Sequence, residues 1–136
     1  MVRDELQALF SGEVNGLVAA CSTNERPLQG LAGRIDWSFQ GALSQFIRNG
    51  SITGENGEFV YIPIRKPGRT FHFLLIGIGA SEVPGSRTAL PKETLEKMKA
   101  SLEQLGLEGM GVSEVDLPGA HTFAHTFSDQ QRWVVL

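Results

Sequence analysis

Apolar residues recur every three or four positions in three segments, the spacing that places them on one face of a helix. The first segment lies near the N-terminus and ends before Gly12. The second follows Asp36, a residue type suited to the N-cap, and ends before Gly50. The third follows Pro91, whose fixed φ suits the first helical position, and ends before Gly106. The apolar positions are Val2, Leu6, Leu9 and Phe10; Phe39, Ala42, Leu43, Phe46 and Ile47; and Leu95, Met98, Leu102 and Leu105.

Continuous apolar runs predict buried strands between these helices. Residues 17–21 form a short run without polar alternation, which is typical of a strand buried on both faces. Residues 58–64 and 70–78 have the pattern of two strands joined by a Pro-Gly turn. The second of these is almost wholly apolar, so we expect it to be central in the sheet. The first contains Pro63, which cannot donate a ladder hydrogen bond and therefore predicts an edge strand.

Two further short strands are predicted at residues 111–117 and 132–136, while residues 121–127 fit no single element. Strands and helices therefore alternate along the chain. This order predicts an α/β fold with helices on both faces of a mixed sheet. A length of 136 residues fits a single domain, here residues 1–136, with a core of its own.

Composition and charge narrow the class of function. The chain is 41% hydrophobic and 20% charged, as in a folded globular protein. A net charge of -3 gives no electrostatic reason to expect a nucleic-acid partner. The single cysteine, Cys21, excludes an internal disulfide and favours a reducing compartment. The N-terminus carries acids where a signal peptide would be basic, and the longest apolar run, residues 71–78, is too short to span a bilayer. We therefore expect a soluble cytoplasmic protein without a membrane partner.

Four short motifs follow one another in a fixed order between residues 17 and 79. They are Pro27-Leu28, Asp36, the loop Thr-Gly-Glu-Asn-Gly-Glu at 53–58, and Leu-Leu-Ile-Gly-Ile-Gly at 74–79. The set resembles the N-terminal domain of the leucyl (cytosol) aminopeptidases. That domain has a Pro-Leu segment, an Asp that opens a helix, a Gly-Lys-x-Gly-Glu type of loop and a hairpin ending in Leu-Leu-Val-Gly-Leu-Gly. In this chain Glu55 stands where the family commonly has lysine.

The resemblance implies a macro-domain-like fold, a three-layer α/β/α arrangement around a mixed sheet. It implies no peptidase activity, because the family's two catalytic metal ions lie in a separate C-terminal domain whose Asn-Thr-Asp-Ala-Glu-Gly-Arg motif has no match here. The family's N-terminal domain contributes mainly to assembly. We therefore expect a non-catalytic, stand-alone domain without a cofactor that acts through protein contacts, as a homo-oligomer or with a separate partner. An accessory subunit of a separately encoded metallo-aminopeptidase is an alternative.

A glycine-rich segment after the predicted central strand is the candidate ligand-binding site. Gly77, Gly79, Ala80 and Ser81 would cradle a phosphate if their backbone amides were free. This predicts, as a second alternative, a macro-like binder of a nucleotide or an ADP-ribose-type phosphate. A dinucleotide fingerprint needs a helix directly after the glycines, and the next predicted helix begins about a dozen residues later. The favoured interpretation is that the glycines allow close packing and a sharp exit from the sheet.

Two histidines, His121 and His125, are the candidate metal ligands. Their spacing puts them on one face of a helix or of a strand, as two zinc ligands require. A third ligand is needed, and the nearby Asp116 and Asp129 are not at a convincing spacing. The surrounding Thr and Phe residues favour a strand or turn, so a structural role is the favoured interpretation and no metal is expected.

Large and basic side chains indicate where a protein partner would bind. Trp37 and Trp133 are expected in the core or at an interface, and an exposed tryptophan would indicate a partner surface. Arg65, Lys66 and Arg69 form a basic hairpin tip, for which a solvated turn is the favoured interpretation and an acidic partner the alternative.

Overall fold

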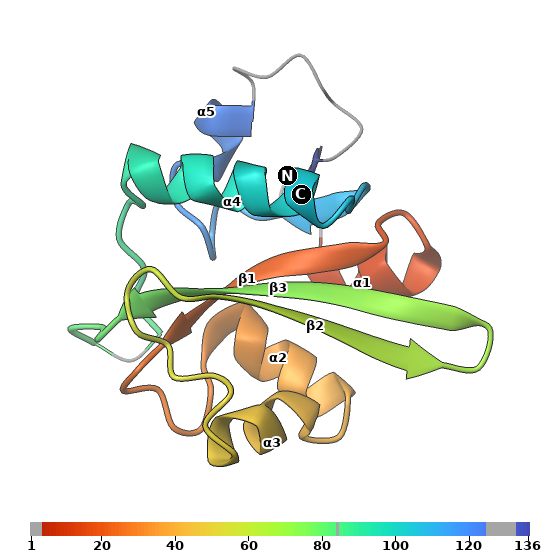
Figure 1. Ribbon diagram of the computed structural model, residues 1–136, viewed down its shortest axis with the longest axis horizontal. Helices are drawn as coiled ribbons and strands as arrows, with labels where there is room; N and C mark the ends of the chain where they lie inside the picture. The colour runs from red at the N-terminus through yellow and green to blue at the C-terminus, as the bar shows by residue number, and fades with distance from the viewer. Residues whose placement is uncertain (1–3, 84, 125–132) are drawn as a thin grey trace.

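The computed structural model describes residues 4–83, 85–124 and 133–136. Five strands in these ranges form one mixed sheet in the order β2-β3-β1-β4-β5, with helices on both faces (Figure 1). Among the described strands, only β2 and β3 pair antiparallel. The predicted three-layer α/β/α fold with a mixed sheet is confirmed. The strands are β1 Gly16–Ser22, β2 Phe59–Lys66, β3 Arg69–Gly79, β4 Met110–Val112 and β5 Trp133–Val135; the helices are α1 Glu5–Ser11, α2 Gly30–Ser38, α3 Ala42–Arg48, α4 Lys92–Gln104 and α5 Ala120–Ala124.

The central strand β1 divides the core into two layers. All seven of its residues are buried, because β3 and β4 flank it and helices cover both of its faces. Leu17, Ala19 and Cys21 pack with α1, α2 and α3 on one face. Val18 and Ala20 pack with α4 and α5 on the other face. A strand buried on both faces was predicted from the continuous apolar run, and it is confirmed.

The β2–β3 hairpin forms one end of the sheet, as its proline predicts. β2 is the edge strand, and Pro63 is exposed there. β3 is buried over most of its length and pairs with β1 as well as β2. Phe39 packs edge-on against Phe71 and Phe73 of β3, with ring centroids 5.1 and 5.3 Å apart. These aromatic contacts fix the short segment after α2 against the sheet.

The helix predicted after Asp36 is wrong in its boundaries, because the chain forms two helices with a sharp turn between them. Gln40 and Gly41 have left-handed φ values of 54° and 79°. A right-handed helix cannot continue through residues in this conformation. Asp36 therefore lies inside α2 and not at an N-cap. Its carboxylate instead accepts hydrogen bonds from the backbone N–H of Ser44, at 2.9 Å, and from the Ser44 hydroxyl. Asp36 thus caps α3 from the preceding helix.

The helix predicted after Pro91 is confirmed, with two local differences. Pro91 is the N-cap and α4 begins at the next residue. Leu95, Met98 and Leu102 are buried, while Leu105 follows the last turn and is 44% exposed. The exposed residues on the outer face include Glu93 and Lys97, whose side chains form an i,i+4 ion pair at 3.5 Å.

The C-terminal region differs most from its predicted pattern. The strand predicted over residues 111–117 is only β4, because the chain turns after Val112 and Leu117 donates its backbone N–H to Ser113 O at 2.8 Å. Val115 in this turn is 66% exposed. Residues 120–124 form the short helix α5, where a strand or turn was favoured.

No helix in the described part of the chain is long and apolar enough to cross a bilayer.

Candidate functional site

The carboxyl ends of β1, β3 and β4 meet at one edge of the sheet because the three strands are parallel. From β1 the chain passes to α2 on one face, and from β4 it passes to α5 on the other face. Such a divergence is the switch point at which open α/β sheets leave a crevice for ligands. A candidate site is therefore expected between the ends of β1 and β4.

Three buried charged residues occupy this switch point, and we call Glu25, Arg87 and Asp116 the charge cluster. The Arg87 side chain is 6% exposed and binds Glu25 in a bidentate pair with N–O distances of 2.9 and 3.0 Å. Its Nε lies 3.5 Å from Asp116 Oδ1. Asp116 Oδ2 accepts a hydrogen bond from the backbone N–H of Ala20 in β1 at 2.7 Å. Asp116 Oδ1 accepts from the N–H of Leu31 in the first turn of α2 at 3.4 Å.

The charge cluster therefore already occupies the positions that an anionic ligand would use. The start of α2 is a natural anion site, and the chain's own Asp116 carboxylate lies there. The guanidinium of Arg87 is directed at the two acids. Nη1 and Nη2 bind Glu25, and Nε lies buried 3.5 Å from Asp116 Oδ1, without a hydrogen bond to any described residue. The cluster fastens the loop after β3 to β1 and α2.

The surroundings move the pKa values of the three groups in different directions. Burial opposes ionisation of Glu25, but hydrogen bonds from Arg87, Gly85 and Ser81 outweigh it and lower the pKa of this carboxyl. Burial likewise opposes the charge of Arg87, and the two acids outweigh it, so the pKa of the guanidinium is raised. Burial raises the pKa of Asp116. The hydrogen bond from the Ala20 N–H and the charge of Arg87 lower it, but burial is the larger effect.

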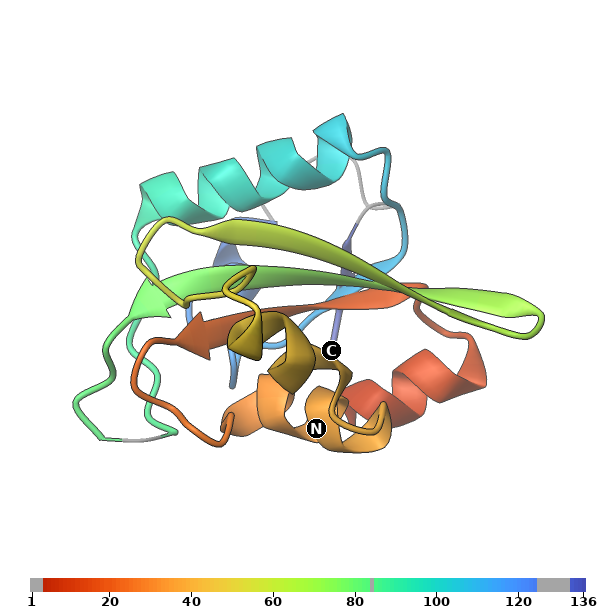
Figure 2. The same cartoon turned by 60° about the horizontal axis from the view of Figure 1, so that its bottom comes forward.

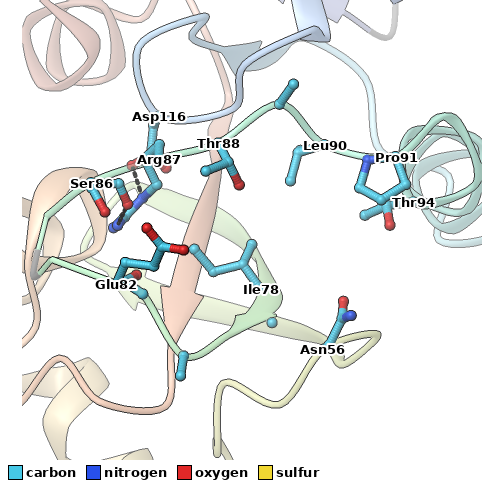
Figure 3. Close-up of a pocket in the computed structure, with 14 residues that line it drawn as sticks. Asn56, Ile78, Glu82, Ser86, Arg87, Thr88, Leu90, Pro91, Thr94 and Asp116 are labelled. Atoms are coloured by element: carbon cyan, nitrogen blue, oxygen red, sulfur yellow. Dashed lines mark hydrogen bonds and ion pairs between the residues drawn. The ribbon is translucent and has the colours of Figure 1, made fainter.

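Beside the charge cluster lies a cavity of about 340 Å³ between the end of β3, the following loop and the start of α4 (Figure 3). Arg87 and Asp116 form part of its wall. Gly77, Ala80 and Ser81 of the predicted ligand-binding segment also line it, whereas Gly79 does not. Its polar lining includes an amide, a carboxylate and four hydroxyl side chains: Asn56, Glu82, Ser81, Ser86, Thr88 and Thr94.

The amides that were predicted to cradle a phosphate are engaged within the chain. Gly77 donates to Glu58 O at 2.7 Å, Gly79 donates to Gly54 O at 2.9 Å, and Ser81 donates to Asn24 Oδ1 at 2.9 Å. The premise of free backbone amides is therefore wrong at these three positions. Ligand binding by the segment itself stays a prediction.

The glycines of this segment have structural reasons to be glycine. A Cβ atom on Gly77 would lie 1.9 Å from Glu55 O, so the loop before β2 packs directly on its backbone. Gly79 has φ 77° and ends β3 in a conformation that other residues adopt only with strain. This agrees with the interpretation of close packing and a sharp exit from the sheet.

The candidate metal site is not assembled among the described residues. His121 lies on α5, with Nε2 3.0 Å from Leu136 O, while His125 falls outside the described residues. The described ranges hold no group of three His, Cys, Asp or Glu side chains placed to bind a metal ion. Cys21 is 1% exposed, and burial raises the pKa of its thiol, which leaves it protonated and unreactive.

A second surface lies on the opposite side of the sheet from α4, where α1 and α2 run side by side (Figure 2). Trp37 on α2 is 87% exposed. A groove of about 380 Å³ opens next to it. We call this surface the α1–α2 face, defined by Leu6, Leu28, Gly33, Arg34 and Trp37. The groove itself was not predicted, because its walls come from two helices. The position of Trp37 off the stripe of buried residues Leu31, Ala32 and Ile35 is the signal that would have indicated its exposure.

The sequence matches no known family model and no curated protein. Among solved structures, a mutant form of tomato leucine aminopeptidase is similar, with a TM-score of 0.50 and 16% sequence identity. The similarity covers 78% of this chain and 21% of that chain, so this chain spans about a fifth of the aminopeptidase. At this identity the likeness shows the fold alone. The five-stranded mixed sheet with its helices is consistent with the N-terminal domain fold of the aminopeptidases.

Proposed function

We propose that this chain is a non-catalytic domain that works through protein contacts and associates with a second copy of itself through the α1–α2 face. The observation that carries the proposal is the 87% exposure of Trp37 beside a groove. Exposed tryptophan is unusual in a monomer, and tryptophan is the residue type most enriched among the dominant contacts of interfaces.

The shape of the α1–α2 face favours a second copy as the partner. A projecting side chain and a groove lie side by side on one surface, so a twofold axis can place each Trp37 into the groove of the other copy. The groove walls offer apolar contact from Leu6 and Leu28 and a close approach to the α2 backbone at Gly33. The nearby Arg34 is already paired with Glu5, so association would not bury an unpaired charge there.

The non-catalytic part of the proposal rests on how the candidate groups are used. Cys21 is buried, and Nε2 of His121 lies 3.0 Å from the backbone carbonyl of Leu136. The three charged residues of the charge cluster are buried and paired with one another. We expect the pure protein to release no leucine from a leucyl amide with manganese or zinc added. Release above the rate of the metal alone would overturn this part.

Light scattering across a concentration series tests the self-association. The wild-type protein is expected to change from the 14.8 kDa monomer to a dimer as concentration rises. The Trp37→Ala variant is expected to stay monomeric at the same concentrations. Leu105→Ala is the matched control, because Leu105 is also an exposed apolar residue, at 44%, and lies at the end of α4 on the other side of the sheet. It should dimerise like the wild type.

A wild-type protein that stays monomeric throughout would contradict self-association. Co-purification of that monomer with a separately encoded metallo-aminopeptidase chain, lost in Trp37→Ala, would favour the accessory-subunit alternative instead. Equal dimerisation of wild type and Trp37→Ala would show that assembly uses another surface.

A further inference from the structure

The cavity beside the charge cluster is lined by residues from several separate parts of the chain. Asn56 comes from the loop before β2, Ile78 from β3 and Thr94 from the first turn of α4, and the segment between β3 and α4 supplies most of the rest. Its volume of about 340 Å³ lies within the roughly 300–1,000 Å³ that is typical of small-molecule sites.

The charges around the cavity do not favour an anion. Arg87 is the one cationic side chain among the described lining residues, and two buried carboxylates hold it. Glu82 adds a further carboxyl group to the lining, beyond the two that hold Arg87. α4 begins at the cavity wall, and Glu93 in its first turn offsets the partial positive charge of the helix start.

Glu82 is an exposed carboxylate of the lining that the fold leaves available to a ligand. Its side chain makes no hydrogen bond or ion pair with any residue that the structure describes. Figure 3 shows it extending from its loop into the ring of lining side chains, between Arg87 and Ile78. Ser86 and Thr88 lie on the returning branch of the same loop, and their hydroxyls can accept further hydrogen bonds (Figure 3).

The remaining lining is aliphatic. Ile78, Leu90 and Pro91 supply apolar wall, and none of the described lining residues is aromatic. A flat ring would therefore find no stacking partner, whereas a methylene chain would find matching surface.

We infer that this cavity binds an aliphatic primary ammonium group, with Glu82 as its counter-ion and hydroxyl oxygens as further acceptors. An ammonium has three donors and no acceptor, so it suits a carboxylate flanked by hydroxyls. A free aliphatic amine and a lysine side chain of another protein carry the same group. This inference stands apart from the α1–α2 face, which lies on other elements.

Calorimetric titration with 1,4-diaminobutane at neutral pH tests the inference. We expect saturable binding to the wild-type protein and an affinity roughly tenfold lower in Glu82→Gln, as for loss of a hydrogen bond to a charged group. Glu103→Gln is the matched control, since it removes the same charge from the exposed far end of α4. It should bind like the wild type. An absence of binding to the wild type, or an equal loss in both variants, would overturn the inference.

Two more ligands identify the source of the ammonium group. A terminally blocked peptide with one lysine that binds more tightly than 1,4-diaminobutane would support a protein partner, and the reverse order would support a free amine. ADP-ribose that binds more tightly than either, with affinity unchanged in Glu82→Gln, would overturn the inference in favour of a phosphate site.

Discussion

At the scale of single residues, Arg87 is the side chain on which we expect the stability of the fold to depend most. It neutralises two buried carboxylates that come from different parts of the chain, and both of its Nη atoms are bound by Glu25. Charges removed from water are tolerated only when they are paired and hydrogen-bonded. The loop between β3 and α4 therefore depends on this guanidinium for its position, as does the cavity wall.

Replacement of Arg87 by methionine should destabilise the protein strongly. The variant leaves Glu25 and Asp116 buried without a cation, a change that typically costs about 3–5 kcal/mol in the free energy of unfolding. Urea denaturation at neutral pH measures it. Lys97→Met on the outer face of α4 breaks only an exposed ion pair and should change the free energy of unfolding by less than about 1 kcal/mol. Similar small losses in both variants would contradict the role given to the charge cluster.

The lowered pKa of Glu25 predicts a specific loss of stability in acid. Burial opposes its charge and the bonds from Arg87 favour it, with a net pKa below the usual 4.5. A carboxyl of this kind stabilises the folded state fully above its unfolded pKa, and the contribution disappears as pH falls through the folded pKa. The contribution of Asp116 to the pH dependence of stability has the opposite sign. Because its pKa is raised in the folded state, its protonation in acid favours folding.

Urea midpoints measured between about pH 7 and pH 3 test this linkage. The wild-type protein should lose more stability than Glu25→Gln over this range, since glutamine does not titrate. A profile of Glu25→Gln as steep as that of the wild type would place the acid-sensitive group elsewhere.

At the scale of elements, local pattern predicted the strands well. The seven buried residues of β1 come from a run without polar positions, and Pro63 correctly indicated the edge. The division between α2 and α3 was not predictable in this way. The apolar positions after Asp36 keep helical spacing across the break, and the turn at Gln40 and Gly41 is specified by left-handed φ values and by the Asp36–Ser44 contact.

Asp36→Ala tests whether that contact fixes the turn. Loss of a capping carboxylate costs about 1 kcal/mol on average, and we expect a decrease of this size in the free energy of unfolding. Glu103→Ala removes an exposed acid from α4 and should stay within about 0.5 kcal/mol of the wild type. An Asp36→Ala variant as stable as this control would show that the turn residues alone separate α2 from α3.

At the scale of the whole molecule, the candidate site was predicted only in part. Gly77, Ala80 and Ser81 do line the cavity, because the end of a buried strand is where ligands reach an α/β sheet. The charge cluster was not predicted, since Glu25 and Arg87 are 62 residues apart and no local pattern pairs them. The aminopeptidase-like fold was predicted from an ordered set of motifs and agrees with a structural match at 16% identity.

The central claim concerns the α1–α2 face, and a dilution series followed by nuclear magnetic resonance tests it most directly. Signals are compared between concentrated and dilute protein, with the Trp37 indole N–H assigned by its absence in Trp37→Phe. We predict shifts confined to Leu6, Leu28, Gly33, Arg34 and Trp37, with the lining of the cavity unchanged. Spectra that do not change with concentration, or shifts centred away from Trp37, would contradict self-association through this face.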